Sequence, residues 1–480
     1  MSNSPLEPSG PEEPPDLSEI LRSLMNGDIG ANPEMADALK QMGLENVDPA
    51  MMQMVGAQIQ AMMSGSADDG SFNVELATDV ARKQVSSVGD ASVTAGTQRD
   101  VEQVVQVANL WLDQVTDFPV SGPASAASRA EWVETTMPAW RGLVEPVAQG
   151  VSGAIRSAMQ EQFRALGSQD LSELGLPPGL DASMVMGQME PIVGRMSAAM
   201  FGMQVGQAVG ALAGDLVTGT EVGLPLIPDG TVMILPANVS AFAEGLHVDA
   251  GEVHLYLAVR EAARMRLFQS VGWVGPALIA AVQKYAGDIR IDTEAIERAV
   301  RETDTTDPAQ LQGVLQNSLF APEPSEAQQA ALAHLELLLA LVEGWVDEVS
   351  ERAVEPHLPN LAALSEAVRR RRASGGPAER VFASLVGLEL RPRLMREAAA
   401  LFTAVEQAEG AAGRDETWKH PDFAPTAAEL PDPARYLARR AGGTEPSRDA
   451  VDDALEALLA QGTAEWEAEG DDPQAPDSSS

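Results

Sequence analysis

A run of nineteen uncharged residues between Arg195 and Asp215 constrains the fold more than any other segment of this chain. It contains four glycines at four-residue spacing, at Gly202, Gly206, Gly210 and Gly214. Residues four apart share one face of an α-helix, so the run predicts a helix against which another backbone can pack closely. Its length is at the lower limit for spanning a bilayer, and polar side chains reduce its hydropathy. We expect a buried helix and no integral membrane segment; a membrane-associated scaffold packing through this face is the less favoured interpretation.

The rest of the chain has a predominantly helical pattern. Helical periodicity runs from Val74 to Leu216 and breaks near residues 118–125 and 175–179. Around residues 222–242, Pro228-Asp229-Gly230 separates two β-prone runs and predicts one small β-hairpin or sheet. We therefore expect a mainly α fold of the α+β class, with the hairpin or sheet placed before a central helix.

Capping patterns mark two later helix starts. Asp249 has Glu252 three residues on, and Ser325 has Gln328 at the same offset. Such side chains satisfy the free N–H groups of a first helical turn, so each pair predicts a helix N-terminus. The four arginines 369–372 precede a Ser/Gly/Pro stretch. We interpret them as basic residues at a helix C-terminus, where the helix dipole favours positive charge, and not as an anion site.

The chain divides into five parts. The ends are rich in proline or acidic residues and cannot bury enough apolar surface to fold, whereas the middle can. The parts are a disordered acidic and Pro-rich tail (1–16), a Met-rich region of short helices with a linker (17–72), a helical core (73–375), a helical C-terminal extension of the core (376–445) and an acidic disordered tail (446–480).

Charge and cysteine content exclude several classes of function. The 71 acidic residues outnumber the 32 basic ones, giving a formal net charge of −39 that would repel a nucleic-acid backbone. The chain has no cysteine, which removes disulfides and thiolate metal sites and is typical of a reducing compartment. The acidic N-terminus lacks the pattern of an export signal. We expect a cytoplasmic protein that binds no nucleic acid.

One segment has the spacing of a metallopeptidase helix. In HExxH the two histidines lie on one helix face and bind zinc, while the glutamate acts as general base on the metal-bound water. Here Glu261 occupies the general-base position, but arginines occupy both ligand positions, at Arg260 and Arg264. Guanidinium stays protonated in proteins and cannot bind zinc. Glu343 follows six apolar residues and is the natural acidic ligand from a later helix.

These segments resemble a family of bacterial zincin-like metallopeptidases, which includes proteins described as hydrolases and others associated with deazaflavin-cofactor biosynthesis. The resemblance spans roughly residues 80–440 and implies a helical zincin-like core. In members with an intact pattern, HExxH occupies positions 260–264 and an EGH-like segment occupies 343–345, where this chain has Trp345 in place of histidine. The segments that carry the resemblance are 206–210, 223–225, 235–238, 260–268, 343–344 and 387–392.

Two functions from different classes follow. The first is a pseudopeptidase without a metal cofactor that binds a peptide or protein partner, its Arg260 and Arg264 forming a structural ion-pair network with Glu343 and with Asp347. In this hypothesis the positive charge of the arginines replaces that of the metal. The alternative without a functional role is that both arginines point to solvent. The rival is an active zinc-dependent hydrolase in which Glu261 is the general base and a rearranged set, such as His254 with Glu343, holds zinc.

Overall fold

The computed structural model describes residues 72–166, 182–287, 325–373 and 393–442. Within them the chain forms eleven α-helices and one two-stranded sheet, so the expected mainly helical fold with a small sheet is confirmed. Both predicted tails, the Met-rich region as far as residue 71 and the break at 175–179 lie outside the described residues. The helices are α4 (Val74–Ser87), α5 (Ala95–Leu112), α6 (Arg129–Leu166), α7 (Ala182–Asp215), α8 (Pro236–Ala243), α9 (Ala250–Ser270), α10 (Val274–Gly287), α13 (Glu326–Val354), α14 (Leu361–Ala373), α16 (Arg393–Glu416) and α17 (Pro433–Ala441).

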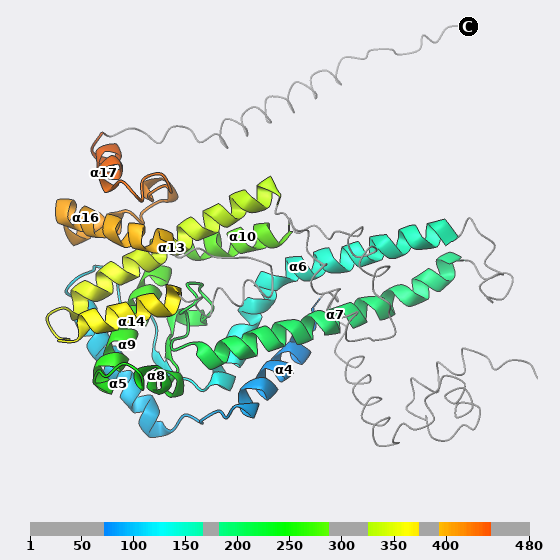
Figure 1. The fold of residues 1–480 in the computed structure, drawn as a ribbon, viewed down its shortest axis with the longest axis horizontal. Coiled ribbons are helices and arrows are strands. Elements are labelled where there is room, and N and C mark those ends of the chain that lie inside the picture. Colours follow the sequence, from blue (N-terminus) through cyan, green and yellow to red (C-terminus); the bar gives the residue numbers. More distant parts are fainter. Residues whose placement is uncertain (1–71, 167–181, 288–324, 374–392, 443–480) are drawn as a thin grey trace, which may run out of the picture.

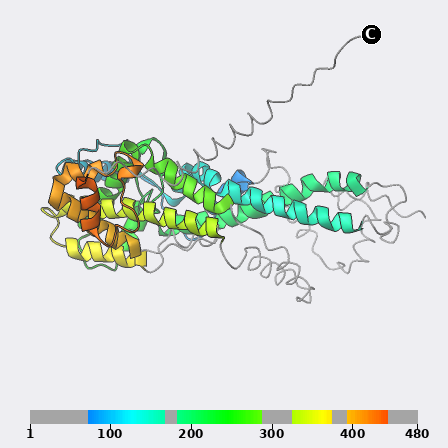
Figure 2. The same cartoon turned by 90° about the horizontal axis from the view of Figure 1, so that it is seen from above.

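The helices form a cluster from which one long pair extends. Helices α6 and α7 run side by side away from the remaining helices, as both views show (Figures 1 and 2). Within the cluster α9 packs against α5 and α13, and α13 packs in turn against α10 and α16. The helices α9 and α13 are therefore the centre on which the other elements assemble.

Helix α9 is buried on all sides. Asp249 accepts hydrogen bonds from the backbone N–H groups of Gly251 and Glu252, so the predicted N-terminus is confirmed. Thirteen consecutive residues from Tyr256 to Phe268 are buried, which marks a core helix with no solvent face there. The predicted start of α13 is also confirmed, because Ser325 and Gln328 form a reciprocal capping box.

The sheet differs from the predicted hairpin. Strand β2 (Val232–Ile234) pairs in parallel with β1 (Ala124–Ala126), with Ala124 opposite Val232, and the predicted partner run 224–227 forms no strand. Residues Pro228–Gly230 form a short 3₁₀ helix instead of a hairpin turn. The hairpin was wrong because β2 finds its partner over a hundred residues earlier, and such a pairing leaves no local turn signal. The small-sheet alternative is confirmed.

The glycine face of α7 packs closely against α4. A Cβ atom on Gly202 would lie 2.7 Å from the carbonyl oxygen of Asn73, and one on Gly206 would lie 2.5 Å from that of Ala77. Gly210 approaches the backbone of Ala81, whereas Gly214 has open space around its Cβ position. The predicted close backbone approach is confirmed for three of the four glycines.

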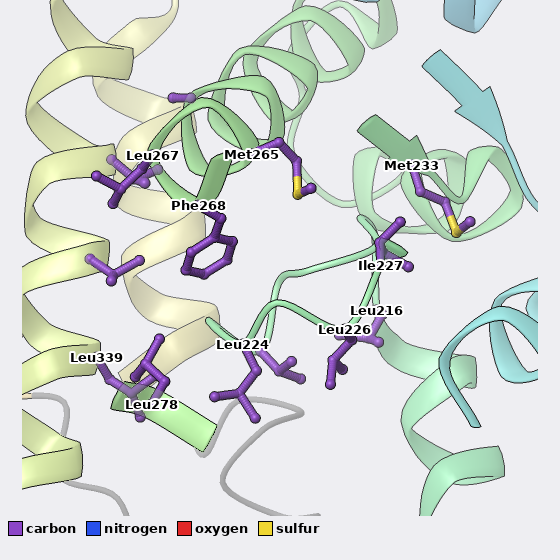
Figure 3. Packing of buried hydrophobic residues seen from close by; sticks show 14 of the residues in the cluster. Leu216, Leu224, Leu226, Ile227, Met233, Met265, Leu267, Phe268, Leu278 and Leu339 are labelled. Atoms are coloured by element: carbon purple, nitrogen blue, oxygen red, sulfur yellow. The ribbon is translucent and has the colours of Figure 1, made fainter. Parts of the chain in front are cut away.

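The apolar core lies between α9, α13, α10 and the segment that precedes β2. In Figure 3, Leu339 of α13 and Leu278 of α10 lie beside Leu224 in the lower part of the view, and Phe268 and Leu267 of α9 lie above them. All of these residues belong to one continuous cluster of buried side chains. This packing holds α9 and α13 face to face and so fixes the charged residues that they carry.

Two apolar segments in the described part meet simple criteria of length and hydropathy for a membrane span. Helix α13 meets them alone, and the pair α9–α10 meets them only if two helices bent by 91° are counted as one span. In α13, 61 % of the most apolar window is buried inside the protein, as in the core helix of a globular domain.

Candidate functional site

Arg260, Glu261 and Arg264 of α9 lie in the protein interior. Their exposed fractions are 4, 0 and 2 %, respectively. Residues 260 and 264 lie four apart and so share the helix face that meets α13. The alternative that the two arginines point to solvent is wrong, because the helix has no solvent face at this point.

Both arginines pair with carboxylates of α13. Arg264 donates from Nε to Glu343 Oε1 at 2.9 Å and from Nη2 to Oε2 at 3.2 Å. Arg260 lies 3.3 Å from Glu343 Oε2 through Nη2 and 2.5 Å from Asp347 Oδ1 through Nη1. Glu343 and Asp347 are also four residues apart, so one turn of α9 faces one turn of α13. The predicted ion-pair network is confirmed.

Glu261 has all its acceptor positions occupied. Its Oε1 accepts from the backbone N–H and the hydroxyl of Thr220, each at 2.8 Å. Its Oε2 accepts from the hydroxyl of Thr218 and from Nη1 of Arg264, each at 2.7 Å. Both threonines come from the segment after α7, where Thr218 bridges to Ile234 of β2. A carboxylate has about four acceptor sites, so this one has no lone pair left for a reacting proton.

A third helix supplies two arginines that sequence reasoning assigned to another role. From α14, Arg372 donates to Glu343 and, at 3.3 Å, to Asp347. Arg371 donates to Glu221 at 2.8 Å and to the backbone carbonyl of Asp215, the last residue of α7. The predicted helix does end at this run, and Arg370, Arg371 and Arg372 lie in its last turn, so the expected C-terminal position is confirmed. In addition, Arg371 and Arg372 reach other elements, which was not predicted. Only the position of an arginine run, and not its partners, is visible in the sequence.

The three helices thus form one cluster in which formal charges cancel. The arginine–carboxylate cluster consists of three guanidinium groups and three carboxylates, from Arg260, Arg264, Arg372, Glu261, Glu343 and Asp347. Burial by itself would raise the pKa of Glu343, but its three arginine neighbours lower that pKa to about 2. Burial raises the pKa of Glu261, against the opposing effect of Arg264 and the threonines. Burial would lower the pKa of Arg260, but Asp347 and Glu343 raise it.

A small cavity lies beside this cluster. Its volume is about 20 Å³, enough for one or two water molecules. Four arginines line it, Arg260, Arg264, Arg371 and Arg372, and Glu221 is the only carboxylate among its lining residues. The rest of the wall consists of Thr218 and the apolar side chains Val217, Phe242, Leu257 and Val368.

The side chains at this place do not fit zinc. Zinc needs ligands with a free lone pair, and the guanidinium groups at positions 260 and 264 offer none. Both oxygens of Glu343 already accept from arginines. Across the described ranges no group of three or more His, Asp or Glu side chains is arranged to hold a metal ion.

His254, the alternative ligand, lies two turns before Glu261 on α9. Its Nε2 is buried and has no hydrogen-bond partner in the described part of the chain. Burial lowers its pKa, so the imidazole is neutral near pH 7. Because no second and third ligand gather around it in these ranges, the structure does not bring His254 and Glu343 together as a metal site.

Trp345 belongs to a second buried polar group. Its indole N–H donates to Asp415 at 2.9 Å, and its ring packs against Phe118. Asp415 also accepts from the guanidinium of Arg414, at 2.8 Å, and from the hydroxyl of Thr116, at 2.6 Å. Position 345 therefore faces α16 and not the arginines of α9. Sequence reasoning missed this group, since no local pattern links residues 116, 345 and 415.

Comparison with known proteins assigns the chain to a family. A family model described as zincin-like metallopeptidase matches residues 72–437, most of the chain. The chain is a zincin-like metallopeptidase family member. The resemblance inferred from the segments around α9 and α13 is thereby confirmed. On α9 the chain carries Arg-Glu-Ala-Ala-Arg at residues 260–264.

A solved structure shares the fold. A crystal structure from Chloroflexus aurantiacus, described as "a putative hydrolase with a novel fold", superposes with a TM-score of 0.52 at 16% sequence identity. The match covers 77% of this chain and 98% of the other. At this identity the likeness establishes the fold alone. No curated protein matches the chain significantly.

Proposed function

We propose that this protein is a metal-free pseudopeptidase of its family, which acts in the cytoplasm by binding a protein or peptide. The observation that carries the proposal is the arginine–carboxylate cluster. Guanidinium groups stand at both ligand positions of the motif helix and neutralise the carboxylates that would otherwise hold or assist a metal. Charge that a divalent ion would supply to Glu343 is supplied here by the protein itself.

The state of Glu261 supports the loss of hydrolysis. A general base must accept a proton from a water within hydrogen-bond distance. Glu261 is completely buried and holds four donors. Its role in this chain is to fix Arg264 and the segment that contains Thr218 and Thr220.

The binding part of the proposal is supported by the partly exposed end of the cavity. Arg371 and Arg372 keep 23 and 16 % of their side chains exposed, whereas Arg260 and Arg264 are buried. A partner can thus reach charged donors beside α14 without opening the core. The acidic surface of the chain limits self-association and disfavours nucleic acid.

Three proteins distinguish hydrolysis from binding without hydrolysis. They are the wild type, Glu261→Gln and, as positive control, the double variant Arg260→His, Arg264→His. Each is incubated with a fluorogenic peptide library, once in the presence of zinc and once in the presence of a chelator. We expect equal background rates for the wild type and Glu261→Gln, and zinc-dependent thermal stabilisation of the double variant alone. Zinc-dependent cleavage by the wild type that Glu261→Gln abolishes would overturn the proposal in favour of an active hydrolase.

Binding is measured on the same library without cleavage. Immobilised peptides are titrated with labelled wild-type protein, and we expect saturable binding of a subset. Absence of any saturable binding would contradict the proposed mode of action, whatever the outcome of the hydrolysis assay.

A further inference from the structure

We propose that the cavity lined by Arg260, Arg264, Arg371 and Arg372 is a carboxylate-binding subsite. It would receive the carboxyl group of the peptide or protein partner, either a free C-terminus or an acidic side chain. The inference rests on the proposed binding function and names the chemistry that the site selects.

The polarity of the cavity wall favours an anion. Four arginines of α9 and α14 line it, and Glu221 is the single acidic residue among the lining residues. The three carboxylates that neutralise the cluster, from Glu261, Glu343 and Asp347, are not among the lining residues. An entering group therefore meets the positive side of the ion pairs. The arginine–carboxylate cluster has no net formal charge, but the cluster residues that line the cavity are arginines.

Arg260 and Arg372 have N–H groups that their carboxylate partners do not use. A guanidinium carries five N–H bonds. Arg260 and Arg372 each reach carboxylates of the described residues through only Nη1 and Nη2, so neither Nε has an acceptor there. Arg264 donates through Nε, Nη1 and Nη2, one bond each to Glu343, Glu261 and Glu343 again. No arginine nitrogen of the described residues is both fully buried and without a partner. The N–H groups that the carboxylates leave unused are therefore solvated, and an entering carboxylate would replace water at them.

The cavity is small. Its volume of about 20 Å³ holds one or two water molecules, which a carboxylate group entering from the partly exposed side would displace. The apolar side chains of Leu257, Phe242 and Val368 complete the wall. They lower the local dielectric constant, which strengthens the attraction between a carboxylate and the guanidinium groups.

The entrance lies beside α14. Arg371 and Arg372 are partly exposed, so a ligand can approach there while the rest of its chain stays in solvent. Arg371 also stacks its guanidinium over the ring of Phe242, 5.5 Å from the centroid, which holds it at the entrance. A carboxyl group at the end of a chain or side chain fits this geometry better than a group in the middle of a backbone.

The subsite is tested by titrating acetate into the full-length protein in an isothermal calorimeter. Ionic strength is held constant with sodium chloride. Arg371→Gln removes one lining guanidinium, and Val368→Leu adds a methylene that fills the space without changing charge. The matched control is Arg370→Gln on the same turn, because Arg370 is 79% exposed, pairs with Glu366 and does not line the cavity.

We expect saturable binding of one acetate per chain, with a Kd in roughly the millimolar range, for the wild type and Arg370→Gln. Arg371→Gln and Val368→Leu should each weaken binding about tenfold or more. Heats that never saturate, or the same affinity in all four proteins, would overturn the subsite. Circular dichroism spectra confirm that each variant is folded.

A second arm separates this inference from the binding function itself. N-acetyl-alanyl-alanine and its C-terminal amide are compared as ligands. Preference for the free acid, lost in Arg371→Gln, supports the capture of a C-terminus, and preference for peptides with internal Asp or Glu supports that of an acidic side chain. Library peptides that bind equally well as acid, amide and neutral variants would contradict the carboxylate subsite and leave the binding function intact.

Discussion

Replacing Glu343 with alanine removes the carboxylate that three arginines share. In Glu343→Ala, Arg264 loses a two-point pair and keeps Glu261, while Arg260 and Arg372 keep only Asp347. Three guanidinium groups then surround two carboxylates in a site with almost no access to water. Breaking a buried pair from one side costs about 3–5 kcal/mol, because the remaining charge stays buried without compensation.

The pKa of Glu343 gives a related quantity, the free energy by which the folded site favours the ionised carboxylate over the protonated one. A fall from the ordinary value of 4.5 to about 2 means that folding favours the ionised carboxylate. At about 1.4 kcal/mol for each pKa unit, this corresponds to about 3 kcal/mol. The two values agree in order of magnitude, so we expect Glu343→Ala to lower the free energy of unfolding by about 3–5 kcal/mol and the Tm by about 6–10 °C.

The measurement is urea unfolding followed by far-UV circular dichroism at pH 7.5. The matched control is Glu348→Ala, one turn further on α13. Glu348 is also largely buried, but its arginine partner, Arg352, is 38% exposed, lies 3.0 Å away and has a second partner in Glu406. We expect a loss of about 1 kcal/mol or less for this control. A loss within 1 kcal/mol for Glu343→Ala would refute the reasoning, as would a loss that disappears in high salt, because buried pairs are weakly screened.

Three further predictions concern other parts of the same account. The folded state lowers the pKa of Glu343, so its contribution to the free energy of unfolding is complete above about pH 4.5 and is lost as the pH falls toward 2. The free energies of unfolding of the wild type and Glu343→Ala should therefore converge as the pH is lowered through this range. Gly206→Val should cost about 2–3 kcal/mol in urea unfolding, because its Cβ would lie 2.5 Å from the Ala77 carbonyl oxygen, while Gly214→Ala, with open space, should be neutral or stabilising; equal effects would contradict the packing of α4 on α7. Trp345→His should lower the free energy of unfolding by about 3 kcal/mol or more in the same measurement. The variant should bind no zinc, because position 345 faces Asp415. Zinc binding by this variant would contradict the structure and would show that position 345 faces α9.

Features that depend on neighbouring residues were predicted well from the sequence. The caps at Asp249 and Ser325 act within one turn, so they identify the starts of α9 and α13 without knowledge of the fold. The spacing of Arg260 and Arg264 placed them on one face of α9. The apolar run before Glu343 indicated that its carboxylate is buried and needs a partner. Together with the resemblance to the metallopeptidase pattern, in which an acidic residue of a later helix faces positions 260 and 264, these facts predicted the ion pairs between α9 and α13.

Features that depend on distant residues were not predictable in this way. In the sequence, α6 and α7 lie between β1 and its partner strand β2. Local signals could suggest only a pairing between neighbouring runs, which is a hairpin. Arg372 contacts Glu343 because α14 packs beside α13. Thr220 donates to Glu261 because the segment after α7 packs against α9. Tertiary packing decides these contacts, and residue types in the sequence do not specify them.

Metal stoichiometry tests the central claim most directly. Full-length protein is purified without a histidine tag or chelators, incubated with zinc, desalted and analysed by plasma mass spectrometry, with the Arg260→His, Arg264→His variant as positive control. The account predicts less than about a tenth of a zinc ion per wild-type chain, because the guanidinium groups of Arg260 and Arg264 cannot bind zinc and already pair with Glu343. Close to one zinc ion per wild-type chain would contradict it and would show that ligands outside the arginine–carboxylate cluster hold the metal.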